Sequence, residues 1–81
     1  MATAIFMGEI RRFTDAVEQC PIDATNYRAA VAELQEKFPG LTDAVLEDFS
    51  VAIDGDLVHS PLLEHFSNDS ELVFIPKIAG G

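Results

Sequence analysis

A single well-marked helix, set between short apolar runs, most limits the folds that this chain can adopt. The sequence predicts the helix over residues 26–38, where Asn26 can cap the first turn by accepting a bond from a free backbone N–H. Four large apolar side chains then recur at helical spacing: Tyr27, Val31, Leu34 and Phe38. Pro39-Gly40 ends the helix, since proline cannot continue it and glycine tolerates a left-handed turn. We expect the apolar stripe to belong to the core.

The apolar runs on either side of this helix are typical of strands. They cover residues 3–8, 14–22, 49–54, 57–58 and 71–75, with a tight turn at Gly55-Asp56. The run 71–75 is almost continuously apolar, which indicates a central strand. Residues 41–48 read as a connection with one helical turn, and Leu62, Leu63 and Phe66 anchor another short turn. Strands on both sides of one helix predict an α+β fold, with the helix packed on one face of a mixed sheet.

Length and charge limit the protein to one small domain with an acidic surface. The 81 residues support a single core, so we expect a domain over residues 1–76 and a flexible tail over residues 77–81. A formal charge of −9 argues against nucleic acid and anionic membrane as partners, and favours a partner with a basic docking face. No apolar run approaches the roughly 20 residues of a membrane span, and no signal-peptide pattern begins the chain. We expect a cytoplasmic protein.

Other candidate sites have simpler interpretations. His59 and His65 lack a recognised ligand spacing, so we expect surface residues and no metal site. Cys20 is the only cysteine, which excludes an intrachain disulfide, and it has no basic neighbour in sequence to stabilise a thiolate. A small buried or half-buried apolar residue is the better interpretation of Cys20. Residues 54–56 (Asp-Gly-Asp) resemble part of a calcium loop, but the other ligand positions are missing, so we expect a hairpin turn.

The tail is the strongest functional signal in the sequence. The chain stops at Gly80-Gly81, shortly after the apolar run 71–75. Two glycines offer no side chain to bury and lose much conformational freedom on ordering, so they predict an exposed, mobile tail. A backbone without Cβ atoms can enter a narrow channel and present its terminal carboxylate to another protein. We therefore expect the carboxyl carbon of Gly81 to be the reactive atom; the alternative is a Gly-Gly pair present by accident.

Three segments carry a resemblance to a known family. Residues 6–11 (Phe-Met-Gly-Glu-Ile-Arg) resemble the first strand and loop of the MoaD group, the small subunit of molybdopterin synthase. Residues 38–41 (Phe-Pro-Gly-Leu) resemble the end of its helix, and residues 71–81 (Glu-Leu-Val-Phe-Ile-Pro-Lys-Ile-Ala-Gly-Gly) resemble its last strand and tail. The resemblance to this group, and to the related ThiS carriers of the thiamin pathway, implies a β-grasp, ubiquitin-like fold and the role of a sulfur carrier.

The resemblance also implies how the tail is used. A ubiquitin-activating-like adenylyltransferase uses ATP to adenylate Gly81, and a persulfide donor then converts it to a thiocarboxylate. The carrier is not itself an enzyme and binds no cofactor permanently. It acts with a sulfur-acceptor enzyme such as the large subunit of molybdopterin synthase. The residues implied to enter a partner's channel are Lys77, Ile78, Ala79 and Gly80, and those implied to dock are Phe74, Pro76, Leu62 and Leu63.

Two departures from the family pattern leave the pathway open. Residues 69–71 read Asp-Ser-Glu where the family commonly has Gly-Asp-Glu, and Lys77 replaces the second of two prolines. A carrier for molybdopterin synthesis is the main expectation. A carrier for thiamin or another sulfur-containing metabolite is an alternative, as is a protein modifier that links Gly81 to a lysine. A pure interaction module, in which Gly81 stays unmodified, is a further class.

Overall fold

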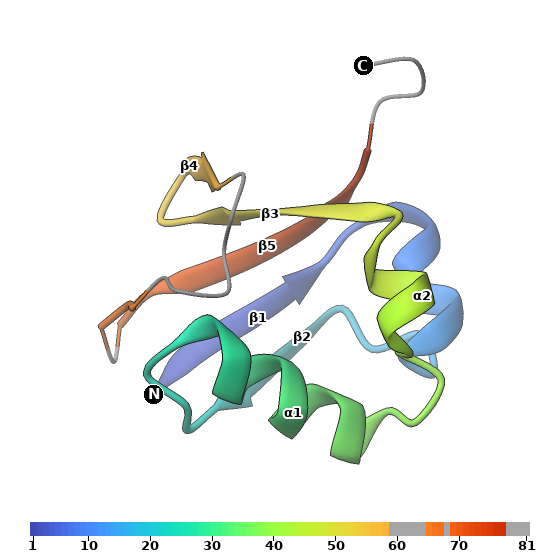
Figure 1. Ribbon diagram of the computed structural model, residues 1–81, viewed down its shortest axis with the longest axis horizontal. Helices are drawn as coiled ribbons and strands as arrows, with labels where there is room; N and C mark the ends of the chain where they lie inside the picture. The colour runs from blue at the N-terminus through green and yellow to red at the C-terminus, as the bar shows by residue number, and fades with distance from the viewer. Residues whose placement is uncertain (59–64, 68, 78–81) are drawn as a thin grey trace.

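A computed structural model describes residues 1–58, 65–67 and 69–77 of the chain (Figure 1). The elements follow the order β1 (Ala2–Phe6), η1 (a 3-10 helix, Gly8–Phe13), β2 (Gln19–Ile22), α1 (Tyr27–Lys37), α2 (Asp43–Leu46), β3 (Phe49–Ile53), β4 (Asp56–Val58) and β5 (Glu71–Pro76). The predicted order of strands, one main helix and further strands is therefore confirmed, including the short helical turn within residues 41–48.

The strands form one mixed sheet in the order β2-β1-β5-β3-β4. β5 lies at its centre, parallel to β1 and antiparallel to β3, as the apolar run 71–75 predicts. β1 and β5 are neighbours in the sheet although most of the chain separates them in sequence, and Figure 1 shows them side by side. The final strand is thus held on both sides by the rest of the fold.

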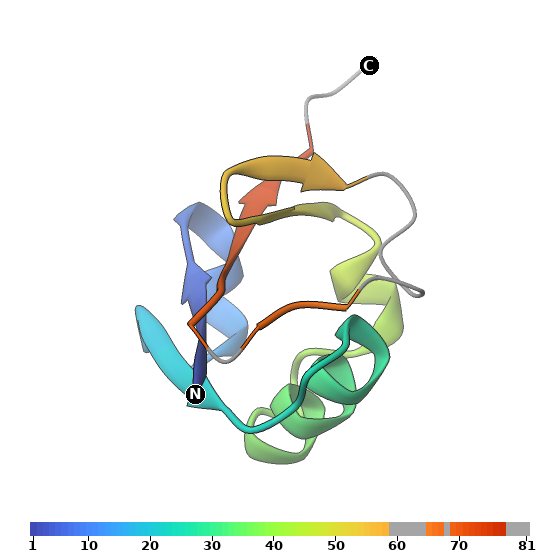
Figure 2. The same cartoon turned by 90° about the vertical axis from the view of Figure 1, so that its left-hand side faces the viewer.

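Helix α1 packs against one face of the sheet (Figure 2). Asn26 caps it as predicted, since its Oδ1 accepts a bond of 2.9 Å from the backbone N–H of Ala29. Tyr27, Leu34 and Phe38 are buried, which confirms the predicted core stripe, while Val31 is half-buried at its edge. The small Ala30 is also fully buried and lets the helix approach the sheet closely.

Aromatic rings form the centre of the core. The Phe6 ring lies 5.7 Å from that of Phe74 and 5.9 Å from that of Phe38, the second pair in an edge-to-face arrangement. Tyr27 adds a fourth ring, 6.3 Å from Phe74, and burial raises the pKa of its hydroxyl. These contacts join β1, β5 and α1, so the central strands and the main helix share one packed cluster.

The predicted strand over residues 14–22 is wrong in its first half. Residues 8–13 form η1, and Asp15 (φ 53°) and Ala16 (φ 65°) both adopt the left-handed conformation, so β2 begins only at Gln19. Local hydrogen bonds hold this turn: Thr14, fully buried, donates from Oγ1 to the Val17 carbonyl at 2.9 Å. These bonds give the backbone an alternative to the sheet, which explains why the apolar alternation there did not predict a strand correctly.

The predicted hairpin turn between β3 and β4 is confirmed. Asp54 (φ 51°) and Gly55 (φ 88°) are both left-handed, which is the type I′ geometry that suits a two-residue hairpin. The Asp54 carboxylate also accepts bonds from the Ser70 hydroxyl at 2.7 Å and from the Glu71 N–H at 3.0 Å. The hydrogen bond from Ser70, followed by that from Glu71, lowers the pKa of Asp54. The carboxylate therefore ties the hairpin to the start of β5.

We expect Asp54→Asn to lower the melting temperature at neutral pH, because a neutral amide accepts these two bonds more weakly than a carboxylate. Since the folded pKa is depressed, the contribution of the carboxylate is present above the unfolded value of about 3.9 and is lost as pH falls through the folded pKa. Thermal melts of both proteins from pH 7 down to pH 2 should therefore converge. A difference that stays constant over this range would show that the charge of Asp54 plays no part.

Candidate functional site

The candidate site begins where β5 ends, and two backbone hydrogen bonds fix this point. The N–H of Met7 donates to the Phe74 carbonyl at 3.2 Å, and the N–H of Lys77 donates to the Asp48 carbonyl at 3.1 Å. The end of β5 is thus held from the β1 side and from the β3 side. We call residues 76–77 the tail root, because the tail predicted from the sequence starts here. The predictions for Ile78, Ala79, Gly80 and Gly81 lie outside the described residues.

Gly8 shapes the tail root by having no side chain. Its φ of +75° is one that residues with a Cβ rarely adopt. A Cβ built there would lie 3.3 Å from Cγ of Pro76, which is shorter than an ordinary van der Waals contact between two carbons. Glycine at this position therefore lets the start of η1 pack directly against the root, and fixes the direction in which β5 ends.

The structure corrects the prediction that Phe74 docks a partner. The Phe74 side chain is 1% exposed and its ring packs against Phe6 and Tyr27 in the core. Side chains alternate between the two faces of a strand, so Leu72 and Phe74 point toward α1 whereas Val73 and Ile75 point away from it. A partner that approaches the face of the sheet opposite α1 would contact Val73 and Ile75.

Apolar side chains form a patch on the face of the sheet opposite α1. Val73 on β5 is paired with Ile5 on β1 and with Ala52 on β3, and Ala52 is paired with Leu57 on β4. Directly paired residues share a face, so one apolar row crosses four strands. We define the outer patch as this row together with Ile75: Ile5, Ala52, Leu57, Val73 and Ile75. Leu57 is 52% exposed and the other four are half-buried, so the patch is accessible to a partner.

The remaining predicted docking residues fall into two groups. Pro76 and Lys77 are exposed at the tail root, where a partner could contact them. Leu62 and Leu63 lie outside the described residues, so their docking role stays a prediction. Sequence reasoning missed the outer patch, although the alternation within residues 71–75 already separates Val73 and Ile75 from their neighbours.

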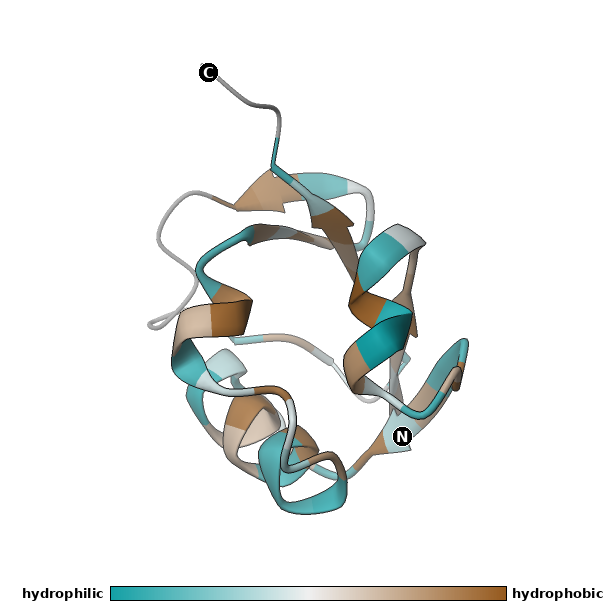
Figure 3. Cartoon of the chain, turned by 90° about the vertical axis from the view of Figure 1, so that its right-hand side faces the viewer, coloured by the Kyte–Doolittle hydropathy of each residue, from teal (hydrophilic) through white to brown (hydrophobic). Residues whose placement is uncertain are grey.

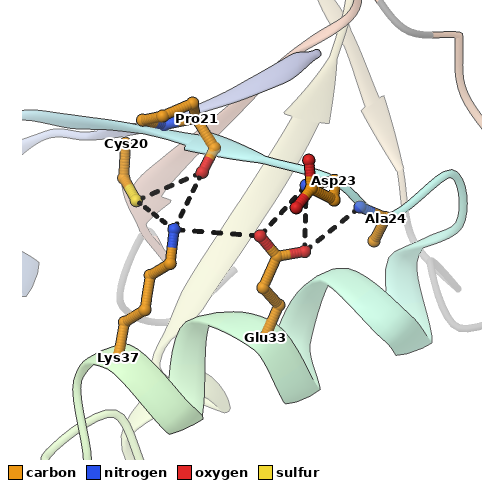
Figure 4. Close-up of polar contacts among 6 residues, drawn as sticks. All are labelled: Cys20, Pro21, Asp23, Ala24, Glu33 and Lys37. Carbon is orange, nitrogen blue, oxygen red and sulfur yellow. Dashed lines mark hydrogen bonds and ion pairs between the residues drawn. The ribbon is translucent and has the colours of Figure 1, made fainter.

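Cys20 is buried, as predicted, but it does have a basic neighbour in space (Figure 4). The ammonium of Lys37 lies 3.5 Å from Sγ of Cys20 and 3.2 Å from the Pro21 carbonyl. Lys37 also pairs with Glu33 at 3.8 Å, and the Glu33 carboxylate accepts bonds from the backbone N–H groups of Asp23 and Ala24. This network fastens α1 to the end of β2, so it has a structural role.

The described residues form neither a metal site nor a membrane-spanning helix. Among residues 1–58, 65–67 and 69–77, no group of three or more His, Cys, Asp or Glu side chains could hold a metal ion. His65 is exposed and its backbone bridges to that of Asn26, while His59 lies outside the described residues. In the described part of the chain, no helix has the length and apolar character needed to cross a membrane.

Comparison with known proteins identifies the family. The ThiS family profile matches residues 4–81, which is nearly the whole chain. The chain belongs to the ThiS family. ThiS-family and MoaD-like proteins are small, ubiquitin-like sulfur carriers or modifiers, so the family expected from residues 6–11, 38–41 and 71–81 is confirmed. No curated protein matches the chain at a significant level of sequence similarity.

Solved structures of other proteins share the fold. The small archaeal modifier protein 1 of Methanosarcina acetivorans has a TM-score of 0.82 at 14% identity, with 99% of this chain and 95% of that chain covered. The protein of the same name from Haloferax volcanii has a TM-score of 0.71 at 16% identity, covering 99% and 98%. A complex of subunits 1 and 2 of the molybdopterin-converting factor from Helicobacter pylori 26695 contains a chain with a TM-score of 0.69 at 19% identity, covering 99% and 97%. These similarities confirm the predicted β-grasp fold.

Proposed function

We propose that this ThiS-family protein is a sulfur carrier whose Gly81 carboxylate is adenylated and then converted to a thiocarboxylate, for use in molybdopterin synthesis. The observation that carries the proposal is the family match, which extends over residues 4–81 and so includes the Gly-Gly pair. The fold supports it physically: the central strand β5 is paired on both sides and ends at the tail root, so a rigid body presents the tail.

The chemistry requires activation because a carboxylate is a poor electrophile. An oxygen of the Gly81 carboxylate attacks the α-phosphorus of ATP, and pyrophosphate leaves with formation of an acyl-adenylate. The terminal sulfur of a persulfide then attacks the acyl carbon and AMP leaves, giving an acyl disulfide. A thiol cleaves the S–S bond, which releases the thiocarboxylate on Gly81 and leaves the sulfur donor in a disulfide. Every catalytic group in this scheme belongs to partner enzymes; this chain supplies the acyl group.

Two kinds of enzyme partner follow from the proposal. An adenylyltransferase of the ubiquitin-activating kind binds ATP and forms the adenylate, and an acceptor enzyme takes the sulfur. The Helicobacter pylori structure, a complex of two molybdopterin-converting factor subunits, supports an acceptor partner of this kind. The outer patch supports docking, because an accessible apolar row beside the end of β5 can hold a partner while the tail is inserted.

Protein modification is the second candidate function. Two structures with the same fold belong to proteins named small archaeal modifier proteins. A modifier would use the same activated Gly81, but a lysine amine would attack the adenylate in place of sulfur. Supply of sulfur to thiamin or another metabolite would differ from the main proposal only in the acceptor enzyme.

Intact-mass spectrometry of the protein isolated from its native cell tests the proposal. We expect a fraction of the chains to be heavier by the difference between one sulfur and one oxygen, and to react with alkylating reagents at Gly81. A branched peptide that joins Gly81 to a lysine of another protein would favour the modifier function instead. Chains that carry neither change, under conditions in which the cell makes sulfur-containing cofactors, would contradict both.

A further inference from the structure

A groove of about 530 Å³ opens beside the tail root. Four apolar residues line it, one each from η1, α2, β3 and β5: Phe13, Val45, Phe49 and Pro76. The first three are half-buried and Pro76 is exposed. Figure 3 shows this end of the molecule, where the short helices α2 and η1 lie on the two sides of the ribbon. Phe49 and Pro76 are directly paired, and they share the face of the sheet that bears Val51 and Phe74. The groove therefore lies on the opposite side of β5 from the outer patch.

Two cations line the groove. Arg12 on η1 and Lys77 after β5 are both exposed, and they are two of only five basic residues in a chain with fourteen acidic ones. Within the described residues the ion pairs are Arg11–Glu18 and Lys37–Glu33, so neither groove cation has a carboxylate within 4.0 Å there. Glu9 and Asp48 also line the groove, which makes its charge balanced. Most of the acidic surface repels a partner's carboxylate, whereas this groove can accept one.

The length of the tail limits which proteins can cover the groove. Four residues follow Lys77, and a fully extended chain of that length spans at most about 14 Å. An enzyme that holds the Gly81 carboxylate in its active site must therefore bring its surface close to the tail root. The groove lies directly at that root, with Pro76 and Lys77 among its walls.

We propose that the groove is a second docking site, which receives an apolar side chain flanked by a carboxylate from the enzyme that adenylates Gly81. The apolar side chain contacts Phe13, Val45 and Phe49, and the carboxylate pairs with Arg12 and Lys77. The tail then leaves between two docking surfaces, the groove on one side of β5 and the outer patch on the other. This inference rests on the proposed function, since it assigns a partner to the same tail.

The test is a charge reversal at Arg12 with a matched control. Arg28, on the exposed side of α1 and away from the groove, offers the same change of charge in Arg28→Glu. The full chain is assayed by ATP–pyrophosphate exchange with the ubiquitin-activating-like adenylyltransferase of the source cell. We expect Arg12→Glu to raise KM about tenfold or more with little change in kcat, because two carboxylates would then face each other. We expect Arg28→Glu to stay close to the wild type, and both variants to melt at the wild-type temperature.

Each result bears on the proposal. Equal KM values for the two variants would overturn the groove assignment while leaving the proposed function intact, because the wild-type chain would still be adenylated. Normal adenylation of Arg12→Glu combined with slower sulfur delivery to the acceptor enzyme would show that the acceptor occupies the groove, which also contradicts the assignment. Absence of exchange with the wild-type chain would contradict the proposed function and this inference together.

Discussion

Deletion of Gly81 is expected to abolish adenylation and sulfur transfer while leaving the melting temperature nearly unchanged. The deletion moves the terminal carboxylate one residue back, onto Gly80, so the acyl carbon no longer reaches the α-phosphorus of bound ATP. Stability should persist because, among the described residues, the core and the hydrogen bonds that hold β5 lie between Ala2 and Lys77. ATP–pyrophosphate exchange and a thermal melt measure the two effects separately.

Substitutions at Gly80 and Ala79 separate the effect of tail length from the effect of side-chain size in the tail. Gly80→Val keeps the carboxylate in place but adds a branched side chain, and should also block adenylation if the activating channel admits only a bare backbone. Ala79→Gly is the matched control, since it removes a side chain and keeps the length, and it should remain active. Full sulfur transfer by the Gly81 deletion would contradict the carrier function.

The sequence predicted the ends of α1 and the hairpin turn correctly, because single residues determine the backbone conformation at these points. Gly40 does not adopt the left-handed turn expected of it, but Asn26 caps α1, Pro39 follows directly after the C-cap Phe38, and Gly55 permits the left-handed turn of the hairpin. Each of these residues acts through its own geometry or side chain, so no knowledge of distant neighbours was needed. The same logic failed at Asp15 and Ala16, two non-glycine residues in left-handed conformations that hydrogen bonds within residues 11–17 stabilise.

The family was predictable from the sequence, whereas the surfaces around the tail root were less so. The terminal Gly-Gly pair and the resemblance of residues 71–81 predict a reactive tail; the family match includes these residues, and their chemistry stays a prediction. Alternation alone cannot tell which face of β5 the helix covers, because both faces carry large apolar side chains. Only the pairing of β5 with β1 and the packing under α1 show that Phe74 is inside and Ile75 outside. The groove is lined by residues of four separate elements, so no local sequence pattern can predict it.

Truncation of Phe74 should therefore mainly lower the stability of the fold, whereas truncation of its neighbour Ile75 should mainly weaken partner binding. Phe74→Ala removes a ring at the centre of the aromatic core, and should lower the free energy of unfolding by about 3–5 kcal/mol. A domain of this length has about 4–12 kcal/mol in total, so the variant should be close to unfolding at physiological temperature. Urea denaturation followed by circular dichroism measures the loss.

Ile75→Ala removes a half-buried side chain from the outer patch and should cost much less stability, because part of that side chain already contacts water. Its main effect should be on binding: truncating one of the few side chains that carry most of an interface's binding energy costs about 1 kcal/mol or more, which corresponds to a several-fold weaker Kd. Isothermal titration of both variants against the acceptor enzyme, at a temperature where both are folded, separates the roles. If Ile75→Ala bound as tightly as the wild type, the outer patch would not be the docking face, and the partner would have to hold the carrier by its tail and by the opposite side of β5.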